Sequence, residues 1–475
     1  MIGLETHVQL KSDSKLFCGC RNPVSYDGKD ELKPNTFVCP TCLGFPGSKP
    51  RLNRKVINFA ISAALALNCK IASKMYFSRK TYFYPDMSKN FQITQYEVPI
   101  AAGGYMEISV GGKKKKIRIT RLHIEEDPAK LVHVKLGSGG YTKVDYNRAG
   151  VPLIEIVTEP DIDTPEEARI YLNKLGQILE YLGVYDFSLE ASMKSDANLS
   201  VNGGNRVESK NITGVKEVHK ALSYEKIRQK NVVKFGGKIE LESRLWDPVA
   251  GVTRRMRKKE TEADYGYIFE PDLPVFEISK DDIECIKESL PELPDEKRIR
   301  FVKQYGLHES EAEKLVSEKE LANLFEKVQE KTGVKIAASW IAGQLKKTLN
   351  YNKTSLRKSR LSDKEIILAL MKFKNGEFTD HITEMILRKM VESGKSVDDA
   401  VSELGLKTIN NKKEISAVIS KVVDKHSMAV DDYLGGVEKS LHFLVGMVVR
   451  ETKGQVSAKD AKDNLIDYIK KKYRK

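Results

Sequence analysis

Short stretches of alternating apolar and polar residues, separated by Gly, Pro and Asn, dominate the chain up to about residue 160. Examples are YMEISV, KIRITRLHIE and PLIEIVTE, whose period of two predicts β-strands. Two glycines separate EISV from KKKKIRIT, so we expect a hairpin with a basic, solvent-facing turn.

Helical spacing interrupts these strands at two places. Apolar residues recur every three to four positions from Val56 to Leu67. The segment Thr164–Glu167 offers an N-cap, a first-turn proline and a capping-box glutamate, and Gly183 ends the pattern. The expected buried stripe of this second helix is Ile170, Leu175, Ile178, Leu179 and Leu182. Further strands are expected at 188–202 and 238–246, around a helix near 217–230.

Near residue 291 the residue pattern changes: Glu, Lys and Leu become frequent and the apolar residues recur with helical spacing. A second helical unit begins near 405. The predicted fold class is therefore α+β, with a mixed α/β domain at 1–290 followed by all-helical modules at 291–404 and 405–475. The last 75 residues carry 15 Lys+Arg against 10 Asp+Glu.

Length and composition agree with a multidomain globular protein, because 475 residues with 40% hydrophobic positions can build several cores. The chain has no apolar run long enough to span a bilayer, and MIGLETHVQL does not resemble a secretory leader. We therefore expect a cytoplasmic protein without a membrane partner. A net charge of +14 favours polyanions such as nucleic acid as ligands.

Four of the six cysteines lie within one short segment, as C-x-C followed by C-x-x-C. Two close pairs joined by a loop can supply four thiolates to a tetrahedral zinc ion. The predicted zinc ligands are Cys18, Cys20, Cys39 and Cys42. Four buried, unligated thiols are the alternative. Because protein would fill all four positions, such a site would be structural.

Two segments predict a second, acidic site. In GLETHVQL the alternation places Glu5, His7 and Gln9 on one side of a strand. In HIEEDP, His123 precedes the carboxylates Glu125, Glu126 and Asp127, which repel one another unless a cation lies among them. Mg²⁺ would suit these oxygens, and a solvated acidic loop is the alternative.

The segment SRKTYFYPDMSKNFQITQYE combines cations with aromatic rings, which suits phosphates and stacked bases. A hairpin with one aromatic core face would give the same pattern. The sequence contains no Walker A motif, no strand-linked GxGxxG and no GxSxG. Common nucleotide-binding and hydrolase motifs therefore do not identify the chemistry.

Nine strings, in order, resemble the family of the B-subunit of the aspartyl/glutamyl-tRNA(Asn/Gln) amidotransferases (GatB). They are IGLETHVQL, VCPTCLGFPG, RKTYFYPDMSKNFQIT, ITRLHIEED, VDYNRAGVPLIEIVTEPDI, SMKSDANLSV, ESKNITGVKEV, KKETEADYGYIFEPDLP and LHFLVGMVVRETKGQ. The resemblance covers essentially the whole chain. It implies a catalytic cradle domain with a zinc-binding insertion, a helical domain and a YqeY-like tail that contacts tRNA.

The resemblance also implies a reaction. ATP phosphorylates the side-chain carboxylate of Glu or Asp wrongly attached to tRNA(Gln) or tRNA(Asn), and ammonia then displaces phosphate to form the amide. The implied enzyme class is an ATP-dependent carbon–nitrogen ligase with glutamine as amido donor. The sequence shows no Gly/Ser-rich amidase segment. The implied partners are therefore the amidase GatA and the small protein GatC, in a heterotrimer.

The matching strings imply roles for individual residues. The implied catalytic residues are Glu5, His7, Lys80, Tyr82, Glu125, Glu126, Asp196 and Asn198. The implied cofactor-binding residues, for ATP, are Lys80, Tyr82, Glu155 and Lys194. The implied Mg²⁺ ligands are Glu5, His7, Glu125 and Glu126.

Two positions depart from the family pattern. Lys194 stands where the family usually has Arg, which removes a bidentate donor, and Gly266 stands in place of a cation between Tyr265 and Tyr267. A structural ion pair between Glu155 and Arg148 is an alternative to a catalytic role for Glu155. His219, His308, His381, His426 and His442 are expected to be structural or exposed.

Two other functions compete with this interpretation: a zinc-bearing tRNA-binding scaffold without kinase activity, and an unrelated zinc-ribbon protein. The joint presence of Glu5, His7, Lys80, Glu125 and Glu126 favours the enzyme over the scaffold. The zinc-ribbon alternative does not account for residues 140–275. The sequence leaves open whether Glu-tRNA(Gln), Asp-tRNA(Asn) or both are substrates.

Overall fold

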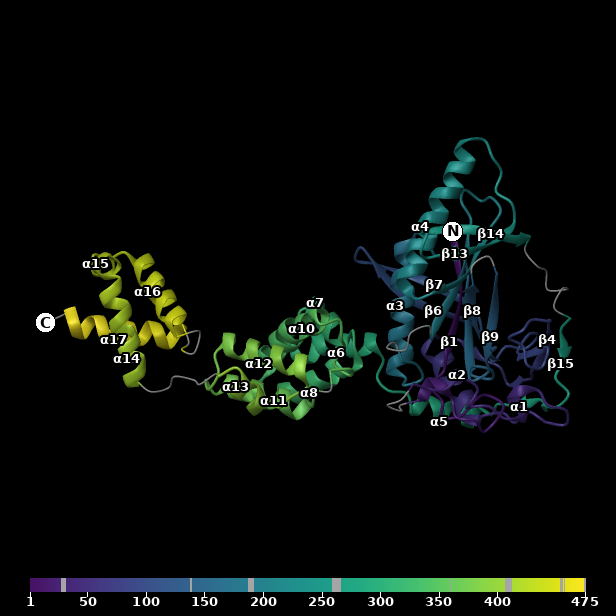
Figure 1. Cartoon of the computed structure of the whole chain (residues 1–475), viewed down its shortest axis with the longest axis horizontal. Helices are drawn as coiled ribbons and strands as arrows, with labels where there is room; N and C mark the ends of the chain where they lie inside the picture. Colours follow the sequence, from purple (N-terminus) through teal and green to yellow (C-terminus); the bar gives the residue numbers. More distant parts are fainter. Residues whose placement is uncertain are drawn as a thin grey trace. The chain divides into compact units, whose positions relative to one another are not determined.

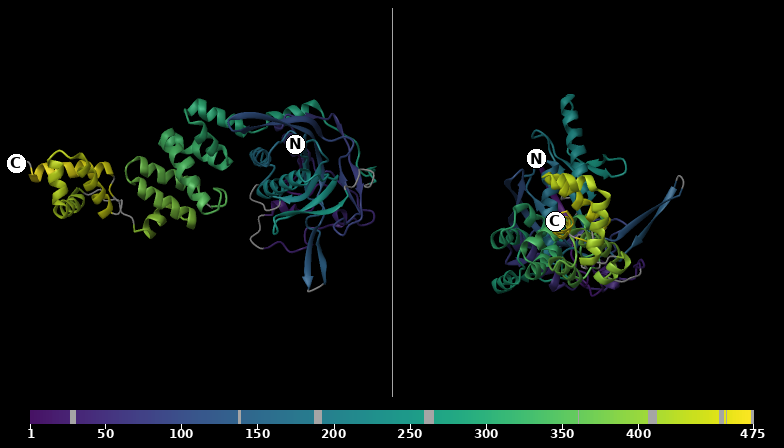
Figure 2. Two further views of the ribbon diagram at one scale, coloured as in Figure 1. Left: turned by 90° about the horizontal axis from the view of Figure 1, so that it is seen from above. Right: turned by 90° about the vertical axis from the view of Figure 1, so that its left-hand side faces the viewer.

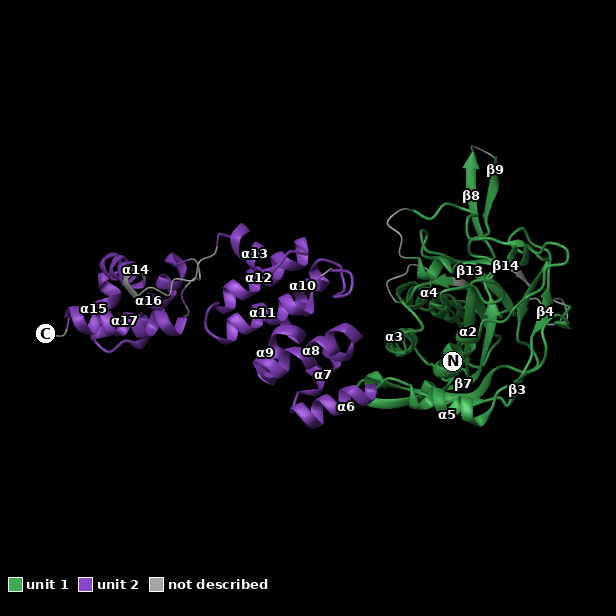
Figure 3. Ribbon diagram, turned by 90° about the horizontal axis from the view of Figure 1, so that it is seen from below, with its two compact units in different colours: residues 1–294 green, residues 295–475 purple. Residues whose placement is uncertain are grey.

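The computed structural model describes residues 1–26, 31–136, 139–186, 192–258, 266–359, 361–405, 412–452, 456 and 458–473. The chain forms two compact units, Met1–Pro294 and Asp295–Lys475 (Figure 3). Strands occur in the first unit, and the described part of the second is helical (Figure 1). The α+β class expected from the sequence is confirmed.

The first unit is built on a 12-stranded sheet. Along the sheet the strands follow the order β14-β13-β12-β11-β1-β10-β7-β5-β4-β15. In addition, β6 pairs with β7, and β2 pairs with β6. The strands of the unit are β1 (Ile2–Gln9), β2 (Lys70–Ile71), β3 (Lys74–Met75), β4 (Ser78–Thr81), β5 (Phe91–Thr94), β6 (Ala101–Val110), β7 (Lys113–Glu126), β8 (Lys130–Leu136), β9 (Gly139–Asp145), β10 (Pro152–Thr158), β11 (Met193–Leu199), β12 (Val207–Thr213), β13 (Glu242–Asp247), β14 (Val252–Lys258), β15 (Ile268–Phe269) and β16 (Phe276–Glu277). Two separate pairs, β8–β9 and β3–β16, lie outside the large sheet.

The helices of this unit follow local signals in the sequence. They are η1 (Pro23–Ser25), α1 (Pro40–Leu43), α2 (Arg54–Ala66), α3 (Pro165–Tyr181), α4 (Val215–Lys234) and α5 (Lys280–Glu288). Thr164 caps α3 by accepting a hydrogen bond from the backbone N–H of Glu167 at 3.1 Å, and Gly183 follows the helix in the left-handed region. Buried residues of α2, α3 and α4 join one apolar core with the strands, so the helices cover one face of the sheet.

Most expected elements of this unit are confirmed. The strands YMEISV, KIRITRLHIE and PLIEIVTE fall within β6, β7 and β10, and the β6–β7 turn uses Gly111 and Gly112, both with positive φ. In α3 the middle of the predicted stripe is buried, whereas Ile170 and Leu182 are half-buried. The strand expected at 188–202 is observed as β11, and residues 187–191 lie outside the described residues.

The second unit consists of short helices around two groups of buried apolar residues. The first group belongs to α6 (Pro294–Tyr305), α7 (Glu309–Val316), α8 (Lys319–Thr332), α9 (Val334–Ala338), η3 (Ser339–Leu345, a π-helix), α10 (Lys346–Tyr351), α11 (Asp363–Lys374), α12 (Asp380–Ser393) and α13 (Val397–Glu403). The second belongs to α14 (Lys412–Lys425), α15 (Ser427–Leu434), α16 (Glu438–Glu451) and α17 (Ala458–Tyr473). The division at 404/405 stays a prediction.

Several expectations fall outside the described residues. These include most of KKETEADY, with Tyr265, and the end of LVGMVVRETKGQ. Among the described residues, no helix combines the length and the apolar character that crossing a membrane requires.

Candidate active site and cysteine cluster

Strand β1 separates the core of the first unit from a polar face. Leu4, Thr6 and Val8 are fully buried in the direction of the helices. The alternate residues, including Glu5 and His7, are half-buried on the other side. The predicted alternation is confirmed, and it places charged side chains in the centre of the large sheet.

The neighbouring strands add their own charges beside His7. In the antiparallel register, His7 lies opposite Glu155 of β10, and Glu155 lies opposite His123 of β7. His7 Nε2 is 3.2 Å from Glu155 Oε2 and 3.5 Å from Glu125 Oε1. One ligand atom from each of His7, Glu125 and Glu155 lies within 4.8 Å of the others, so this group could hold a cation.

His123 completes this group from below the surface. Its Nε2 is 3.0 Å from Glu155 Oε2, while its Nδ1 is buried without a hydrogen-bond partner among the described residues. Burial is the largest single effect and opposes protonation, but the charges and hydrogen bonds of Glu155 and Glu125 together outweigh it and raise the pKa of His123 to about 9 and of His7 to about 10. The same histidines overcome burial and hold the pKa of Glu155 well below its usual range. The group is therefore a buried network of opposite charges.

A second acidic group lies on the same polar face, where β1 pairs with β11 rather than with β10. Glu5, Asp196 of β11 and Glu208 of β12 also have carboxylate oxygens within 4.8 Å of one another. Asn198 Nδ2 donates to Glu5 Oε1 at 3.0 Å, and Lys210 Nζ lies 3.4 Å from Glu208. This all-oxygen set suits Mg²⁺, Ca²⁺ or Mn²⁺.

Glu126 is placed apart from both groups. Adjacent residues on a strand face opposite sides, so Glu126 turns away from Glu125. Its carboxylate pairs with Lys89 and accepts the backbone N–H of Ile93 at 2.9 Å. The structure therefore brings together Glu5 with Asp196, and His7 with Glu125 and Glu155, rather than the four expected Mg²⁺ ligands in one set.

Lys80 and Tyr82 lie at β4 and directly after it. Lys80 lies opposite Gln92 of β5. Gln92 is two residues before Thr94 on the same strand, and the Thr94 hydroxyl donates a hydrogen bond to Glu125 at 3.2 Å. Strand alternation therefore puts Lys80 on the same side of the sheet as Glu125. Beyond Tyr82, Phe83 is 81% exposed and Tyr84 54% exposed, so these two rings do not form an aromatic core.

Lys194 lies opposite His7 on β11. Burial lowers its pKa, and the nearby Asp127 carboxylate partly compensates. Arg148 lies 3.7 Å from Asp127 and donates to the Pro128 carbonyl, so the alternative of an Arg148–Glu155 ion pair is wrong for the described structure.

The second departure, Gly266, has a φ of +48° and open space around the position of a Cβ. Next to it, Tyr267 stacks on Tyr96 with ring centroids 4.0 Å apart. The left-handed backbone at this position favours glycine, because other residues adopt a positive φ at a cost.

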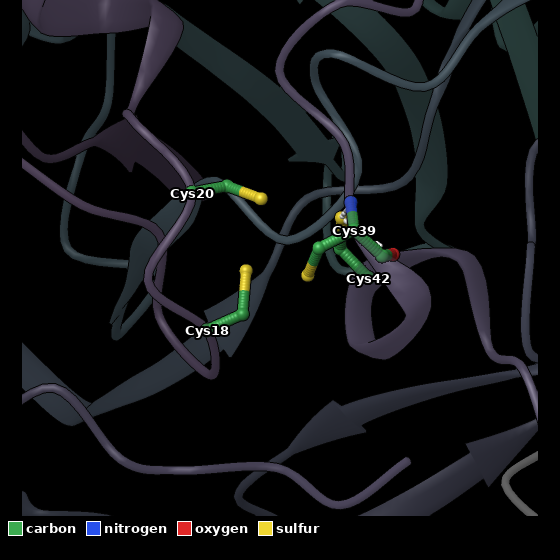
Figure 4. A group of neighbouring side chains, drawn as sticks. All are labelled: Cys18, Cys20, Cys39 and Cys42. Atoms are coloured by element: carbon green, nitrogen blue, oxygen red, sulfur yellow. Dashed lines mark hydrogen bonds between the residues drawn. The ribbon is translucent and has the colours of Figure 1, made fainter.

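Two of the clustered cysteines, Cys18 and Cys20, come from a loop, and the other two, Cys39 and Cys42, from the start of α1; their sulfur atoms point toward a common centre (Figure 4). All four Sγ atoms lie within 4.8 Å of one another. A tetrahedral zinc site requires sulfur atoms about 3.8 Å apart, so small side-chain adjustments suffice. The donor chemistry fits zinc.

Lys15 holds this cluster from inside the protein. It is fully buried, donates to the Phe37 carbonyl at 2.7 Å, and lies 3.7 Å from Cys42 Sγ. A hydrogen bond from Cys18, together with this ammonium, overcomes burial and lowers the pKa of Cys42 to about 5. Burial raises the pKa of Cys20 to about 12. One thiolate is thus stabilised before a metal arrives.

Sequence reasoning missed Glu208 and gave no role to His123. Glu208 joins Glu5 because β12 pairs with β11, a long-range register that ESKNITGVKEV does not reveal. For His123 the signal was available: it alternates with Glu125 on one side of the same strand.

Comparison with known proteins identifies the family of the chain. The family model described as GatB/GatE catalytic domain matches residues 1–284, and the one described as GatB domain matches residues 323–469. A protein of Carboxydothermus hydrogenoformans, described as the B-subunit of aspartyl/glutamyl-tRNA(Asn/Gln) amidotransferase, is 43% identical over 99% of this chain and 98% of its own. Proteins of Methanococcoides burtonii and Methanoregula boonei with the same description are 42% and 44% identical, over 99% and 96% of this chain and 98% and 95% of their own. The chain belongs to the GatB family, the B-subunits of the aspartyl/glutamyl-tRNA(Asn/Gln) amidotransferases.

Proposed function

We propose that this chain is the component of a glutamine-dependent amidotransferase that activates the side-chain carboxylate of Glu-tRNA(Gln), Asp-tRNA(Asn) or both, using ATP. The observation that carries the proposal is the charged face of the sheet: strands β7, β10, β1, β11 and β12 place two buried or half-buried acidic groups side by side. Burying so many charges destabilises a fold, so their presence argues for a chemical role.

The reaction proceeds in two steps. A side-chain carboxylate oxygen forms a bond to the γ-phosphorus of ATP and ADP leaves; this activation is needed because a free carboxylate is a poor acyl donor. The nitrogen of ammonia then bonds to the acyl carbon and phosphate leaves, which gives the amide. The chain contributes charge and orientation to both steps.

Two residue sets would hold divalent cations, for which Mg²⁺ is proposed: His7 with Glu125 and Glu155, and Glu5 with Asp196 and Glu208. A bound cation would neutralise phosphate charge during transfer. His123 orients Glu155 through the 3.0 Å contact, and Asn198 orients Glu5. Lys80, Lys194 and Lys210 add positive charge on the same side, where phosphate oxygens need it. Tyr82 would line the nucleotide position.

The cysteine cluster is proposed to bind one structural zinc ion through Cys18, Cys20, Cys39 and Cys42. No sulfur remains for a substrate in a four-thiolate site. Its effect is to fix the loop that carries Gly44, whose Cβ position lies 3.0 Å from the carbonyl oxygen of Ser88.

Ammonia would come from the amidase GatA, held with the small protein GatC and this chain in a heterotrimer. The helical tail, which contains the lysine-rich α17, would contact the tRNA body through phosphates. Glu126, which pairs with Lys89 away from Glu125, is not proposed as a ligand of either cation. A cytoplasmic location remains the expectation from the sequence.

The test is reconstitution. The chain is combined with its candidate GatA and GatC partners, mischarged tRNA, ATP and either glutamine or NH₄Cl, and amidated aminoacyl-tRNA is quantified. Amide formation that requires this chain, ATP and mischarged tRNA is the expected result. Amide formation without ATP, or without this chain, would contradict the proposal.

A further inference from the structure

The hairpin formed by β8 and β9 stands away from the body of the first unit (Figures 2 and 3). Its two strands have seven residues each, so it extends about 23 Å. Val132, Leu136 and Tyr141 are 42%, 63% and 50% exposed. An isolated two-stranded hairpin is marginally stable in water, and an exposed apolar stripe on it indicates a binding surface.

One side of the hairpin combines apolar and basic groups. Val132 lies opposite Lys143, and Val134 lies opposite Tyr141. Residues directly opposite each other share a side, and so do alternate residues. This side, called here the hairpin surface, consists of Lys130, Val132, Val134, Leu136, Tyr141, Lys143 and Asp145, which lies opposite Lys130.

The charges of the hairpin surface favour a polyanion. Neither Lys130 nor Lys143 forms an ion pair with any described residue, and Lys143 Nζ lies 5.8 Å from the centre of the Tyr141 ring. The one carboxylate of the hairpin, Asp145, accepts backbone N–H groups of Asn35 and Asn147 at 3.0 Å. Protein–protein interfaces are depleted in lysine, whereas lysine beside an exposed aromatic ring is typical of single-stranded RNA sites.

The hairpin is also fixed beside the candidate active site. Strand β7 ends at Glu126 and β8 begins at Lys130. Arg148 donates to the carbonyl groups of Pro128 and Ala129 at 2.9 and 2.5 Å. Asn35, in the left-handed region, donates to the Val144 carbonyl and accepts from Tyr146 N–H. The hairpin surface therefore starts a few residues from Glu125.

We infer that the hairpin surface binds the unpaired 3′ end of the substrate tRNA. The inference rests on the proposed function, which requires the aminoacyl ester at that end to lie against the charged face. Tyr141 would stack on an unpaired base while Lys130 and Lys143 contact phosphates. The surface would thus deliver the 3′ end to the site without taking part in the chemistry.

The test compares two double variants in the reconstituted complex. Lys130→Ala with Lys143→Ala should raise the KM for mischarged tRNA about tenfold, leave kcat unchanged, and reduce the slope of log(kcat/KM) against log salt by about 1.4. Lys113→Ala with Lys114→Ala removes the same charge from the β6–β7 turn and should change neither quantity. Equal effects of both double variants would overturn the inference.

Two further measurements test the inference independently of the lysine variants. Tyr141→Ala should raise the KM without changing the salt slope. A labelled acceptor-stem minihelix should bind the wild-type complex more tightly with its unpaired 3′ end than without it, and the lysine double variant should lose this difference. If the double variant instead dissociates from GatA during sedimentation, the surface is a protein interface and the inference is wrong. If wild-type protein forms no amide, the proposed function fails, whatever the minihelix does.

Discussion

The cysteine cluster and the charged face of the sheet are assembled in opposite ways. The four cysteines lie within 25 residues of sequence, and a loop and the start of α1 bring them together. The charged face draws on five strands and on residues from Glu5 to Lys210. Local spacing therefore identifies the first cluster, whereas only the sheet order creates the second.

The two clusters also differ in their expected effect on the fold. A zinc ion at the cysteine cluster would cross-link two parts of the chain, so its loss would remove a stabilising constraint from the fold. Glu125 and His123 are 5% exposed and Glu155 is 8% exposed, so an unbalanced charge there is far more unfavourable. Changes at the cysteine cluster should therefore affect stability alone, whereas changes in the charged face should affect both stability and chemistry.

The largest predicted effect comes from the charged face. Glu155→Gln or His7→Ala should reduce amide formation at least 1000-fold, about 4 kcal/mol of transition-state stabilisation, because each would remove a proposed cation ligand. The affinity for tRNA should stay within several-fold of wild type in filter binding. Lys220→Ala, an exposed residue of α4, is the matched control. Normal turnover by either variant at saturating Mg²⁺ would refute the assignment.

Cys39→Ser should act on stability instead. Removing one of four thiolates opens the tetrahedral site, so we expect loss of about one zinc per chain and a fall of about 3 kcal/mol in the free energy of unfolding. Metal analysis and urea unfolding measure both quantities. Cys285→Ser, at an exposed cysteine outside the cluster, should change neither. A wild-type protein without zinc would remove the basis of this prediction.

The histidines of the charged face predict a pH dependence in the metal-free protein. Burial lowers the pKa of His7, but Glu155, Glu125 and Asp196 together raise it from 6.5 to about 10. The corresponding stability is present below pH 6.5 and is lost as the pH rises through 10. The free energy of unfolding should fall by on the order of 2 kcal/mol, less than the full shift implies, because 27% of the side chain is exposed.

Unfolding in urea between pH 7 and 10, with EDTA, measures this decline. His7→Gln should show a smaller decline, and Mg²⁺ should reduce it in the wild type by replacing the lost positive charge. An identical decline in both proteins would mean that other groups cause it.

The smallest predicted effect concerns Lys194. Lys194 lies opposite His7 on β11, at a position where the resemblance to the family implies Arg. Lys194→Arg keeps the charge and adds a fork that can reach Asp127, so kcat/KM for ATP should change less than about threefold. A change of 100-fold in steady-state kinetics would show that this chain has adapted to lysine.

Much of this arrangement could be read from the sequence. The alternation of β1 gave the polar side with Glu5 and His7, and the cap at Thr164 gave the start of α3. The β8–β9 hairpin was not predicted, although KLVHVKL and YTKVD alternate around a glycine-rich turn. Its strands lack a buried side, so hydrophobic periodicity gave a weak signal.

The register between distant strands could not be read in this way. Glu208 reaches Asp196 only because β12 pairs with β11, and Glu155 reaches His7 only because β10 pairs with β1. Such pairings depend on tertiary packing rather than on local spacing. By contrast, the separation of Glu126 from Glu125 follows from alternation alone, and the resemblance to the family masked it.

The proposed activation of the carboxylate is tested most directly by measuring transfer of the γ-phosphate of ATP to the aminoacyl group. Wild-type complex is incubated with [γ-³²P]ATP, Mg²⁺ and mischarged tRNA in the absence of glutamine and ammonium, and the tRNA is isolated at low temperature. We predict ³²P on the aminoacyl group, released by hydroxylamine, and none in Glu155→Gln, while Cys285→Ser behaves as wild type. Labelling of equal extent in Glu155→Gln and in the wild type would contradict the claim that the charged face activates the carboxylate.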